Sequence, residues 1–378
     1  PSDWKEARVS PLHKNGVKND PSNYRPISVI PAVSKIFEKI IFDQLYAYLN
    51  DNNLLSQCQS GFRSLHSTLT ALLEATNDWC VNVDNEMLNG VVFIDLKKAF
   101  DTIDHGILLQ KLECYGVDTA GLRWFESYLF GRSQKCSVNG KLSNSARVTC
   151  GVPQGSSLGP LLFLVYINDL PNCLNNSTPR MFADDTSISY SADSLEQLQS
   201  VMNSELTNLN DWLITNKLSL NIFKTEFMIV GSRQRINANQ DNNMSIRIDD
   251  REINRVYSVK SLGLHIDSHL TWSVHIEKVC KKISSAIGAL KRIRSCISIK
   301  TAIQVYSALI QPHFDYCCSV WDGLGETLST KIQKLQNRAV RVITRSSYDT
   351  NASDLLNALH LDNLYIRRRK LKAQLMFK

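Results

Sequence analysis

The sequence predicts a mixed α/β body followed by a helical, basic C-terminal lobe. Short apolar runs such as GVVFI at 90–94 have the length of buried strands, and they alternate with segments of helical periodicity. From about residue 270 onward the pattern is helical to the end. Residues 271–378 hold 18 Lys and Arg against 7 Asp and Glu, whereas residues 1–270 hold 25 against 29. The basic lobe therefore favours a polyanionic partner, although a charge run is also typical of a solvated face.

Periodicity also predicts the individual elements. A Pro-punctuated segment extends to residue 31, and the stretch 181–190, MFADDTSISY, alternates like a hairpin. The polar segment 231–243 is typical of a loop. Helices are expected at 33–49, 68–79, 107–115, 161–170 and 195–213, and strands at 90–94 and 227–230.

Composition narrows the classes of protein to consider. With 43% hydrophobic and 21% charged residues, the chain has the make-up of an ordinary globular protein. The longest apolar run, at 161–167, is too short to span a bilayer, and the N-terminal PSDWKEARVS lacks the apolar core of a signal peptide. Ten cysteines without a Cys-x-x-Cys pair predict free thiols, and we interpret His265, His269 and His275 as ordinary residues rather than zinc ligands. We expect neither a membrane partner nor zinc.

Two adjacent acids, Asp184 and Asp185, occupy the middle of the expected hairpin. Asp is a common turn residue, so a plain turn is one interpretation. The other is that a divalent cation neutralises the two like charges, because Mg²⁺ prefers carboxylate oxygen. If the strand that ends before Asp95 pairs beside the hairpin, three carboxylates converge, and such a set can hold two Mg²⁺ ions roughly 3.5 to 4 Å apart. The sequence thus predicts a candidate metal site at these three residues.

The remaining acids receive simpler interpretations. Asp249 and Asp250 follow the alternating Ile246 and Ile248, which predicts a second hairpin turn without a catalytic role. Asp101 and Asp104 follow the first strand closely, and we interpret each as a turn residue or a helix N-cap.

Seven motifs follow one another along nearly the whole chain. They are NYRPIS (23–28), QSGFRSLHST (59–68), FIDLKKAFD (93–101), GVPQGSSLGPLLF (151–163), FADD (182–185), LNIFKTEFM (220–228) and SLGLHID (261–267). Together they resemble the motifs of reverse transcriptases encoded by non-LTR, LINE-type retrotransposons, in the style of the jockey and CR1-like groups. The resemblance implies an α+β right-hand polymerase with an antiparallel sheet in fingers and palm. Fingers and palm would occupy 1–270 (fingers mainly 1–85, palm mainly 86–270), and a basic helical thumb with a C-terminal extension would occupy 271–378.

The resemblance also implies catalytic roles. Asp95 and Asp184 would be the main metal ligands and Asp185 the supporting acid, for two Mg²⁺ ions that Mn²⁺ can replace. Lys224 in LNIFKTE would protonate the departing pyrophosphate, as a positioned lysine can do. A solvated lysine at the end of a strand is the competing interpretation.

A nucleotide pocket is implied as well. Phe100 would close the pocket against a 2′-hydroxyl, with a core phenylalanine as the alternative. Arg63 would grip the triphosphate, since a guanidinium offers a fixed fork of donors, and Arg25 would either assist or form a structural salt bridge. Gln154 would hydrogen-bond near the nucleotide, and Gly155 would permit close approach of the backbone.

Contacts with primer and template are implied further along the chain. Leu262 and Gly263 resemble the primer-grip turn of the family. A stripe of cations at helical spacing would follow a phosphate backbone without reading bases, although a solvated arginine-rich helix fits the same pattern. This basic stripe consists of Lys331, Lys334, Arg338, Arg341 and Arg345. The cluster RRRK at 367–370 favours the nucleic-acid interpretation.

The implied function is RNA-directed DNA polymerisation, with an RNA template, a DNA primer and dNTPs as partners. An inactive or domesticated relic that only binds nucleic acid is the alternative. Phe100 argues against a viral RNA-dependent RNA polymerase, and LTWSVHIEKV at 270–279 argues against a group II intron type. By resemblance we expect an intracellular location, in the nucleus and in a cytoplasmic ribonucleoprotein. Because NYRPIS lies close to residue 1, we also expect no nicking of intact duplex DNA.

Overall fold

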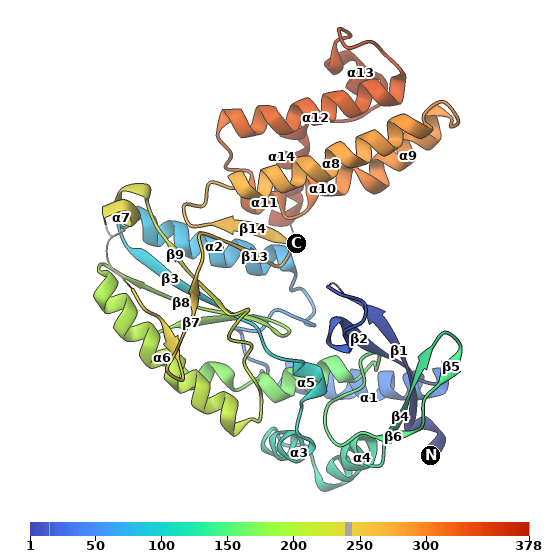
Figure 1. The fold of residues 1–378 in the computed structure, drawn as a ribbon, viewed down its shortest axis with the longest axis vertical. Coiled ribbons are helices and arrows are strands. Elements are labelled where there is room, and N and C mark those ends of the chain that lie inside the picture. The colour runs from blue at the N-terminus through green and yellow to red at the C-terminus, as the bar shows by residue number, and fades with distance from the viewer. Residues whose placement is uncertain (15, 239–243, 378) are drawn as a thin grey trace. The chain divides into compact units, whose positions relative to one another are not determined.

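The computed structural model describes residues 1–14, 16–238 and 244–377, and the chain folds into two compact units (Figure 1). The first unit contains Pro1–Ser67, Gly90–Phe227 and Asn242–Arg255. The second unit contains Thr68–Asn89, Met228–Asp241 and Val256–Lys378. The units therefore interleave along the sequence, and the expected division into fingers with palm and thumb at residue 270 stays a prediction about functional lobes.

Helices of the first unit begin where the sequence supplies a cap or a proline. Asp104, Asp118 and Ser194 each accept a hydrogen bond from a backbone N–H in the first turn of the helix that follows. A proline precedes the first helix and another stands in the first turn of the buried one. The helices are α1 (Ala32–Asp51), α3 (His105–Cys114), α4 (Thr119–Leu129), α5 (Gly159–Ile167) and α6 (Leu195–Thr215), with 3₁₀ turns η1 (Ser2–Trp4), η2 (Pro21–Asn23), η3 (Ala99–Asp101) and η4 (Leu170–Cys173).

One sheet of the first unit has the strand order β2-β1-β4-β5, with β6 paired to β4. Its β1 pairs antiparallel with β2 and parallel with β4. Pro26 lies on the edge strand, and Pro11 lies beyond the part of β1 that pairs with β4, so both prolines are compatible with strands. The strands are β1 (Glu6–His13), β2 (Tyr24–Val29), β4 (Ser133–Val138), β5 (Lys141–Leu142) and β6 (Ala146–Arg147).

The second sheet has the order β12-β9-β3-β8-β7 and carries the candidate catalytic residues. Its central strand β3 is almost wholly buried, which explains why this part of the sequence is continuously apolar. A separate hairpin joins β10 to β11. The strands are β3 (Leu88–Ile94), β7 (Thr178–Phe182), β8 (Asp185–Ala192), β9 (Glu226–Val230), β10 (Arg247–Ile248), β11 (Arg251–Glu252) and β12 (Asn254–Arg255).

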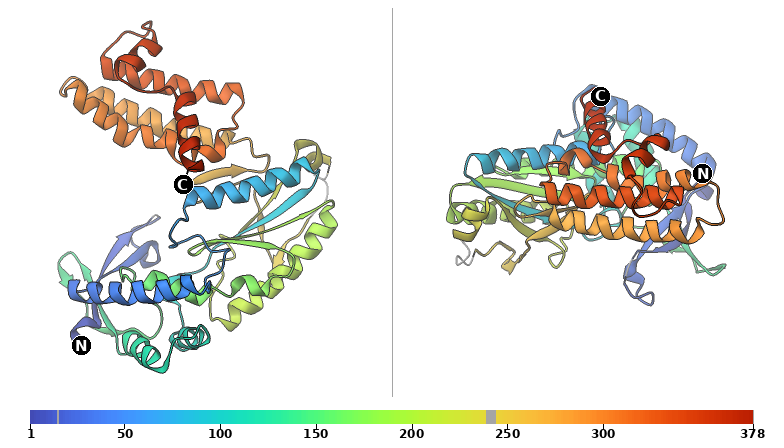
Figure 2. Two further views of the ribbon diagram at one scale, coloured as in Figure 1. Left: turned by 180° about the vertical axis from the view of Figure 1, so that it is seen from behind. Right: turned by 90° about the horizontal axis from the view of Figure 1, so that it is seen from above.

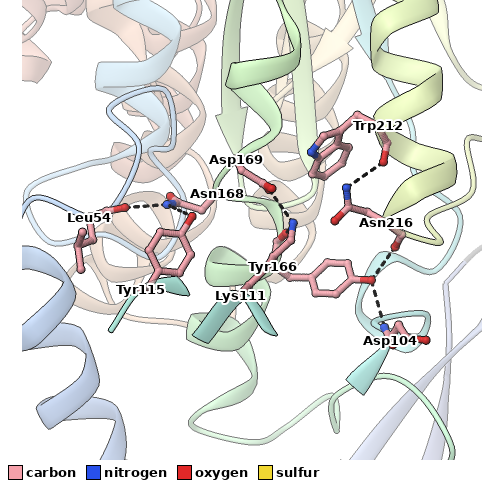
Figure 3. A network of polar contacts seen from close by, with 9 residues as sticks. All are labelled: Leu54, Asp104, Lys111, Tyr115, Tyr166, Asn168, Asp169, Trp212 and Asn216. Atoms are coloured by element: carbon pink, nitrogen blue, oxygen red, sulfur yellow. Dashed lines mark hydrogen bonds and ion pairs between the residues drawn. The ribbon is translucent and has the colours of Figure 1, made fainter. Parts of the chain in front are cut away.

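A polar network holds the C-terminal end of α5 to its neighbours in the first unit (Figure 3). The Tyr166 hydroxyl donates to the Asn216 carbonyl at 2.6 Å and accepts from the backbone N–H of Asp104 at 3.2 Å. The Lys111 ammonium donates to the Tyr166 carbonyl and to the Asp169 carboxylate, both at 2.6 Å. A buried polar group without a partner costs about 1–3 kcal/mol, so this network stabilises the C-terminal end of the otherwise apolar α5.

The second unit is mainly helical, as predicted for the C-terminal region. Helices α8, α9 and α12 lie side by side in every view and contact one another (Figures 1 and 2). The helices are α2 (Thr68–Asp84), α7 (Arg233–Ala238), α8 (Ser273–Ile293), α9 (Ile299–Leu309), α10 (Gln311–Asp315), α11 (Cys318–Trp321), α12 (Glu326–Thr344), α13 (Ala352–Ala358) and α14 (Leu364–Met376). A hairpin of β13 (Ser258–Ser261) and β14 (Leu264–Asp267) completes the unit.

Some predicted elements differ from those observed. The segment 231–243 contains α7, so the loop prediction is wrong there, and its residues 239–243 lie outside the described part of the chain. Helix α4 and the sheet of β1 and β2 were not predicted. The turn at Asp249 and Asp250 is confirmed, with φ of 48° and 58° between β10 and β11. Asp104 is the N-cap of α3, as expected.

Two further findings concern the chain as a whole. Within residues 1–14, 16–238 and 244–377, the helices are too short or too polar to cross a membrane. All ten cysteines are free thiols, as their spacing predicted.

Candidate active site

Asp95 follows the last residue of β3 and is held by the segment that contains Lys224. Its carboxylate accepts a hydrogen bond from Nδ2 of Asn221 at 2.8 Å, and its carbonyl accepts one from the backbone N–H of Asn221, also at 2.8 Å. One residue thus restrains both the side chain and the backbone of Asp95. Sequence reasoning missed Asn221, although it stands inside the LNIFKTEFM motif, which was the available signal.

The hairpin of β7 and β8 closes through Ala183 and Asp184. Phe182 pairs with Asp185, so Asp185 is the first residue of β8 and the loop carries only one of the two acids. Ala183 is buried and has a left-handed φ of 57°, which costs a non-glycine residue roughly 1–2 kcal/mol. Asp184 and Asp185 are exposed. The predicted hairpin is confirmed, and it presents both acids at its tip.

Asp184 and Asp95 both act electrostatically on Asp185. Desolvation raises the pKa of Asp185, repulsion from Asp184 and then from Asp95 raises it further, and Lys14 lowers it. Like charges that raise a pKa destabilise the ionised form of the carboxyl group. A bound cation would relieve this repulsion, so the electrostatics of the tip favour cation binding.

The donor chemistry of this group fits Mg²⁺, which prefers carboxylate oxygens. In the described part of the chain, however, no group of three or more His, Cys, Asp or Glu side chains is arranged so that it could hold a metal ion. The structure therefore brings Asp95, Asp184 and Asp185 within electrostatic reach of one another without forming a closed metal cluster.

Lys224 lies in a turn that begins at Asn221. Its backbone N–H donates to the Asn221 carbonyl at 3.0 Å, and its side chain is exposed. The next residue, Thr225, is fully buried, and its hydroxyl accepts from the backbone N–H of Asp95 at 3.4 Å. The turn ties Lys224 to the segment that holds Asp95, and its role as a proton donor stays a prediction.

Phe100 stands between a buried and an exposed aromatic ring. It stacks on Phe163, with ring centroids 4.3 Å apart and an interplanar angle of 21°. Phe62 meets it edge-on at 6.3 Å. Phe163 is fully buried on α5, whereas Phe62 is 48% exposed. One side of Phe100 therefore belongs to the core, and the gating role of the ring stays a prediction.

The loop of Gln154 and Gly155 is pinned to its own unit. Gln154 donates from Nε2 to the carboxylate of Asp101 at 2.9 Å, and its carbonyl accepts from the backbone N–H of Ser28 at 2.7 Å. Gly155 has a φ of 128°, and a Cβ at this position would lie 2.4 Å from the Ser28 carbonyl oxygen. Glycine is thus required here by the contact with Ser28. Asp101 is a partner of Gln154, and burial raises the pKa of its carboxyl group.

Arg63 holds the loop in which it stands. Its Nη1 donates to the carbonyl of Ser56 at 2.7 Å and to that of Gln59 at 3.2 Å. Arg25 is exposed on β2. The contacts of Arg63 orient its guanidinium, while a triphosphate contact by either arginine stays a prediction.

The expected primer-grip turn joins β13 to β14 in the second unit. Leu262 and Gly263 form a two-residue loop with φ of 43° and 88°. The Tyr316 hydroxyl donates to the Leu262 carbonyl at 2.7 Å, and a Cβ on Gly263 would lie 3.0 Å from the Tyr316 ring. Behind the hairpin, the backbone N–H of His265 donates to Nδ1 of the buried His275 at 3.4 Å. Sequence reasoning missed Tyr316 and assigned no role to His275.

The basic stripe lies on α12 and is only partly free to meet a partner. Lys331, Lys334 and Arg338 are exposed. Arg341 donates from Nε to the Thr350 carbonyl at 3.1 Å, and Arg345 ends the helix in a left-handed conformation and donates to the Arg294 carbonyl at 2.7 Å. The first three cations remain candidates for phosphate contact, whereas the last two also hold the fold.

Three of the four cations in the RRRK cluster on α14 are paired with acids inside the second unit. Arg367 makes two hydrogen bonds of 2.6 Å to the carboxylate of Asp315. Arg368 is paired with Asp322 and Lys370 with Asp362. Arg369 is exposed, and its Nη1 donates to the Tyr365 hydroxyl at 3.5 Å. The sequence cannot distinguish paired from free cations, and a role of this cluster in nucleic-acid binding stays a prediction.

The second sheet presents acids at the end of β3 and the start of β8, and a basic helical unit completes the chain. These features are those of a template-directed nucleic-acid polymerase. The family of reverse transcriptases (RNA-dependent DNA polymerases) matches residues 12–266, so the chain belongs to the reverse transcriptase family. The mixed α and β fold predicted from the sequence is confirmed.

Relatives with curated names confirm the resemblance to non-LTR elements. The probable RNA-directed DNA polymerase from transposon X-element of Drosophila melanogaster is 26% identical over 97% of this chain. That from transposon BS of the same organism is 28% identical over 96%, and the RNA-directed DNA polymerase from mobile element jockey is 25% identical over 96%. The chain spans about 40% of the length of each of these proteins.

A solved structure also resembles this fold. Telomerase from Candida tropicalis in complex with a TWJ fragment of telomeric RNA matches 94% of this chain and 64% of that chain, with a TM-score of 0.49 and 12% identity.

Proposed function

We propose that this chain is an RNA-directed DNA polymerase that extends a DNA primer along an RNA template. Membership of the reverse transcriptase family supports the reaction class. The observation that carries the proposal is the placement of Asp95, Asp184 and Asp185 at the ends of the neighbouring strands β3 and β8, where Asp184 and Asp95 both raise the pKa of Asp185.

Reverse transcriptases as a family generally depend on divalent metal, and we propose that these three carboxylates hold two Mg²⁺ ions, with Mn²⁺ as a substitute. When bound, the metal supplies the positive charge that makes a primer 3′-hydroxyl nucleophilic and stabilises the leaving pyrophosphate. Asn221 orients the Asp95 carboxylate for this task through its 2.8 Å hydrogen bond. Lys224, in the same turn, would donate a proton to pyrophosphate.

The nucleotide would be held by residues of the first unit. Phe100 would exclude a 2′-hydroxyl by contact, with its ring steadied from behind by Phe163. Arg63 would meet the triphosphate, and its bonds to two carbonyls reduce the freedom that its side chain would lose on binding. Gln154 and Gly155 would border the pocket through the loop that Asp101 and Ser28 restrain.

The second unit would bind the primer and template. Leu262 and Gly263 would contact the primer, and the exposed Lys331, Lys334 and Arg338 would neutralise backbone phosphates without reading sequence. We place this activity inside the cell, in the nucleus and in a cytoplasmic ribonucleoprotein. A relic that only binds nucleic acid is the second candidate, because the acids do not form a closed metal cluster.

Primer extension tests the proposal. Purified protein is given an RNA template annealed to a DNA primer, dNTPs and Mg²⁺, and extension is followed with time. Asp184→Asn keeps the shape of the turn and removes a charge, so we expect extension to fall by roughly 10²–10³-fold, the scale on which single transition-state groups act.

The matched control is Asp249→Asn. It makes the same change in the tip of another two-residue hairpin, and it should extend like the wild type. Full activity of Asp184→Asn would return the acid pair to the role of a plain turn. Binding of template and primer without extension by the wild type would favour the relic.

A further inference from the structure

A short segment of the QSGFR motif pairs with the edge of the catalytic sheet. The backbone N–H of Ser60 donates to the Met181 carbonyl at 2.8 Å, and the N–H of Met181 donates to the Cys58 carbonyl at 2.8 Å. Gln59 and Met181 form an isolated parallel bridge. Because β7 is the last strand of its sheet, this segment covers an otherwise open edge next to the catalytic turn.

The Gln59 side chain then reaches the turn itself. It is 2% exposed. Its Oε1 accepts from the backbone N–H of Ala183 at 2.9 Å and from that of Gly61 at 2.7 Å, and its Nε2 donates to the Ala183 carbonyl at 3.4 Å. One amide therefore satisfies both backbone polar groups of Ala183, the residue with the left-handed φ of 57° that immediately precedes Asp184. Only a side chain with both a donor and an acceptor at this distance can do so.

Gly61 lets the segment come this close. A Cβ at this position would lie 2.1 Å from the backbone nitrogen of Ala183 and 2.9 Å from its Cα, so no other residue fits without a backbone shift. The glycine φ lies outside the left-handed range, so space rather than conformation requires it.

The same loop carries groups expected at the nucleotide. Arg63 donates to the Gln59 carbonyl at 3.2 Å, and the ring of Phe62 meets that of Phe100 edge-on. Gln59 thus stands between the loop that would meet the triphosphate and the turn that carries the acids.

We propose that Gln59 is a positioning residue, which sets the orientation of Asp184 and Asp185 through Ala183 and couples the QSGFR loop to the catalytic turn. The proposal rests on the proposed function of these acids. Without the Gln59 amide, the strained Ala183 peptide loses its restraint, and the acids spread apart under their own repulsion. The consequence is weaker metal binding and slower chemistry.

Two substitutions at Gln59 separate its hydrogen bonds from its volume. Gln59→Met keeps the length and removes all three side-chain hydrogen bonds, and Gln59→Glu keeps the acceptor and removes the amide donor. The control is Glu205→Gln. Glu205 is fully buried and accepts hydrogen bonds from the backbone N–H groups of Asn175 and Asn176, in the loop that leads into β7 at the end opposite the acids. This variant perturbs a buried anchor of the same strand away from the acids.

Mn²⁺ binding, followed by the Mn²⁺ EPR signal, and the kcat of primer extension are measured for each variant, with thermal unfolding alongside. We expect Gln59→Met to weaken Mn²⁺ affinity and to lower kcat by about 10- to 100-fold, the range found for groups that orient metal ligands. The Mn²⁺ affinity and the kcat of Gln59→Glu should lie between those of Gln59→Met and those of the wild type. Glu205→Gln should leave both quantities unchanged at temperatures where it is folded.

The outcomes separate the two proposals. If Gln59→Met binds Mn²⁺ and extends the primer like the wild type, Gln59 is an ordinary buried anchor. The same conclusion follows if its losses of Mn²⁺ affinity and kcat are no larger than those of Glu205→Gln. If the wild type binds Mn²⁺ without extending, the proposed function fails, and the Mn²⁺ affinity of Gln59→Met still decides the positioning role. If the wild type does neither, both proposals fall.

Discussion

Two hairpins, β7–β8 in the first unit and β13–β14 in the second, end in turns of a similar kind that are held in different ways. Each places a non-glycine residue in a left-handed conformation, Ala183 with φ of 57° and Leu262 with φ of 43°. Such a conformation costs roughly 1–2 kcal/mol, so each turn needs a restraint from elsewhere in its unit.

The restraints differ in kind. At the first turn, the buried Gln59 pairs with both backbone polar groups of Ala183, and Gly61 approaches so closely that no side chain fits. At the second turn, the Tyr316 hydroxyl pairs with the Leu262 carbonyl at 2.7 Å and with the Thr68 hydroxyl at 3.3 Å, and the tyrosine is 44% exposed.

The difference follows from what each turn carries. The first turn places Asp184 beside Asp185, whose carboxyl group Asp184 and Asp95 repel, so a looser turn would let the acids move apart. The second carries Leu262 and Gly263, which have no charge to hold in place. We infer that a turn carrying charges that repel each other requires a buried side chain that bonds both its backbone N–H and its carbonyl. An uncharged turn is held through its carbonyl by a partly exposed side chain.

The largest expected contrast comes from a glycine-to-alanine substitution at Gly61, which packs against the first turn, and at Gly263, which lies in the second. Gly61→Ala puts a methyl group 2.1 Å from a backbone nitrogen, so we expect about 2–3 kcal/mol of lost stability and a fall in primer extension of about two orders of magnitude. Gly263→Ala meets a φ of 88° and a side-chain ring that can shift. We therefore expect it to lose about 1 kcal/mol of stability and less than about tenfold in the rate of primer extension. Urea unfolding and extension rates are compared side by side. Equal losses at both glycines would remove the contrast between the turns.

Local patterns made part of this site predictable. An apolar run that ends at Asp95 and an alternating run around Asp184 are signals of period and composition, and both were confirmed as β3 and the β7–β8 hairpin. The restraints were not predictable, because Gln59 lies 124 positions from Ala183 and Tyr316 lies 54 from Leu262. No local pattern encodes such a pairing.

The same limit explains the errors in the fold. The strands β1 and β2 carry Pro11 and Pro26, which argue against strands unless the edge position of β2 is known. The basic run at 367–370 likewise does not reveal which of its cations are paired, because Arg367 pairs with Asp315 and Arg368 with Asp322. Both depend on neighbours that are distant in sequence.

A smaller expected effect is a pH dependence of the free energy of unfolding, caused by a histidine next to the second hairpin. His275 is 4% exposed, and desolvation, followed by His265 and Lys282, lowers its pKa to about 4. In the unfolded chain its pKa is about 6.5, so the unfolded state binds a proton more readily. Stability present above pH 6.5 is therefore lost as the pH falls toward 4, by about 2 kcal/mol at pH 5.

Urea unfolding at pH 7 and pH 5 measures this loss. His275→Gln should remove most of the dependence, because it removes the titrating ring behind β14. His360→Gln, at an exposed histidine, is the control and should keep the wild-type difference. An unchanged pH dependence in His275→Gln would assign the loss to other groups.

The smallest expected effect comes from Tyr316→Phe, which keeps the ring against Gly263 and removes the bond to the Leu262 carbonyl together with the longer contact to the Thr68 hydroxyl. A net hydrogen bond contributes about 1 kcal/mol, so a loosened primer-grip turn should raise the KM for primer and template about fivefold. The kcat at saturating primer should not change, since the acids at the other hairpin keep their restraint. Tyr48→Phe is the matched control, because the Tyr48 hydroxyl donates to the Tyr115 carbonyl at 2.9 Å and the residue is 40% exposed. A fall in kcat with an unchanged KM would show that the second turn serves the chemical step, and the division of labour between the two hairpins would then be wrong.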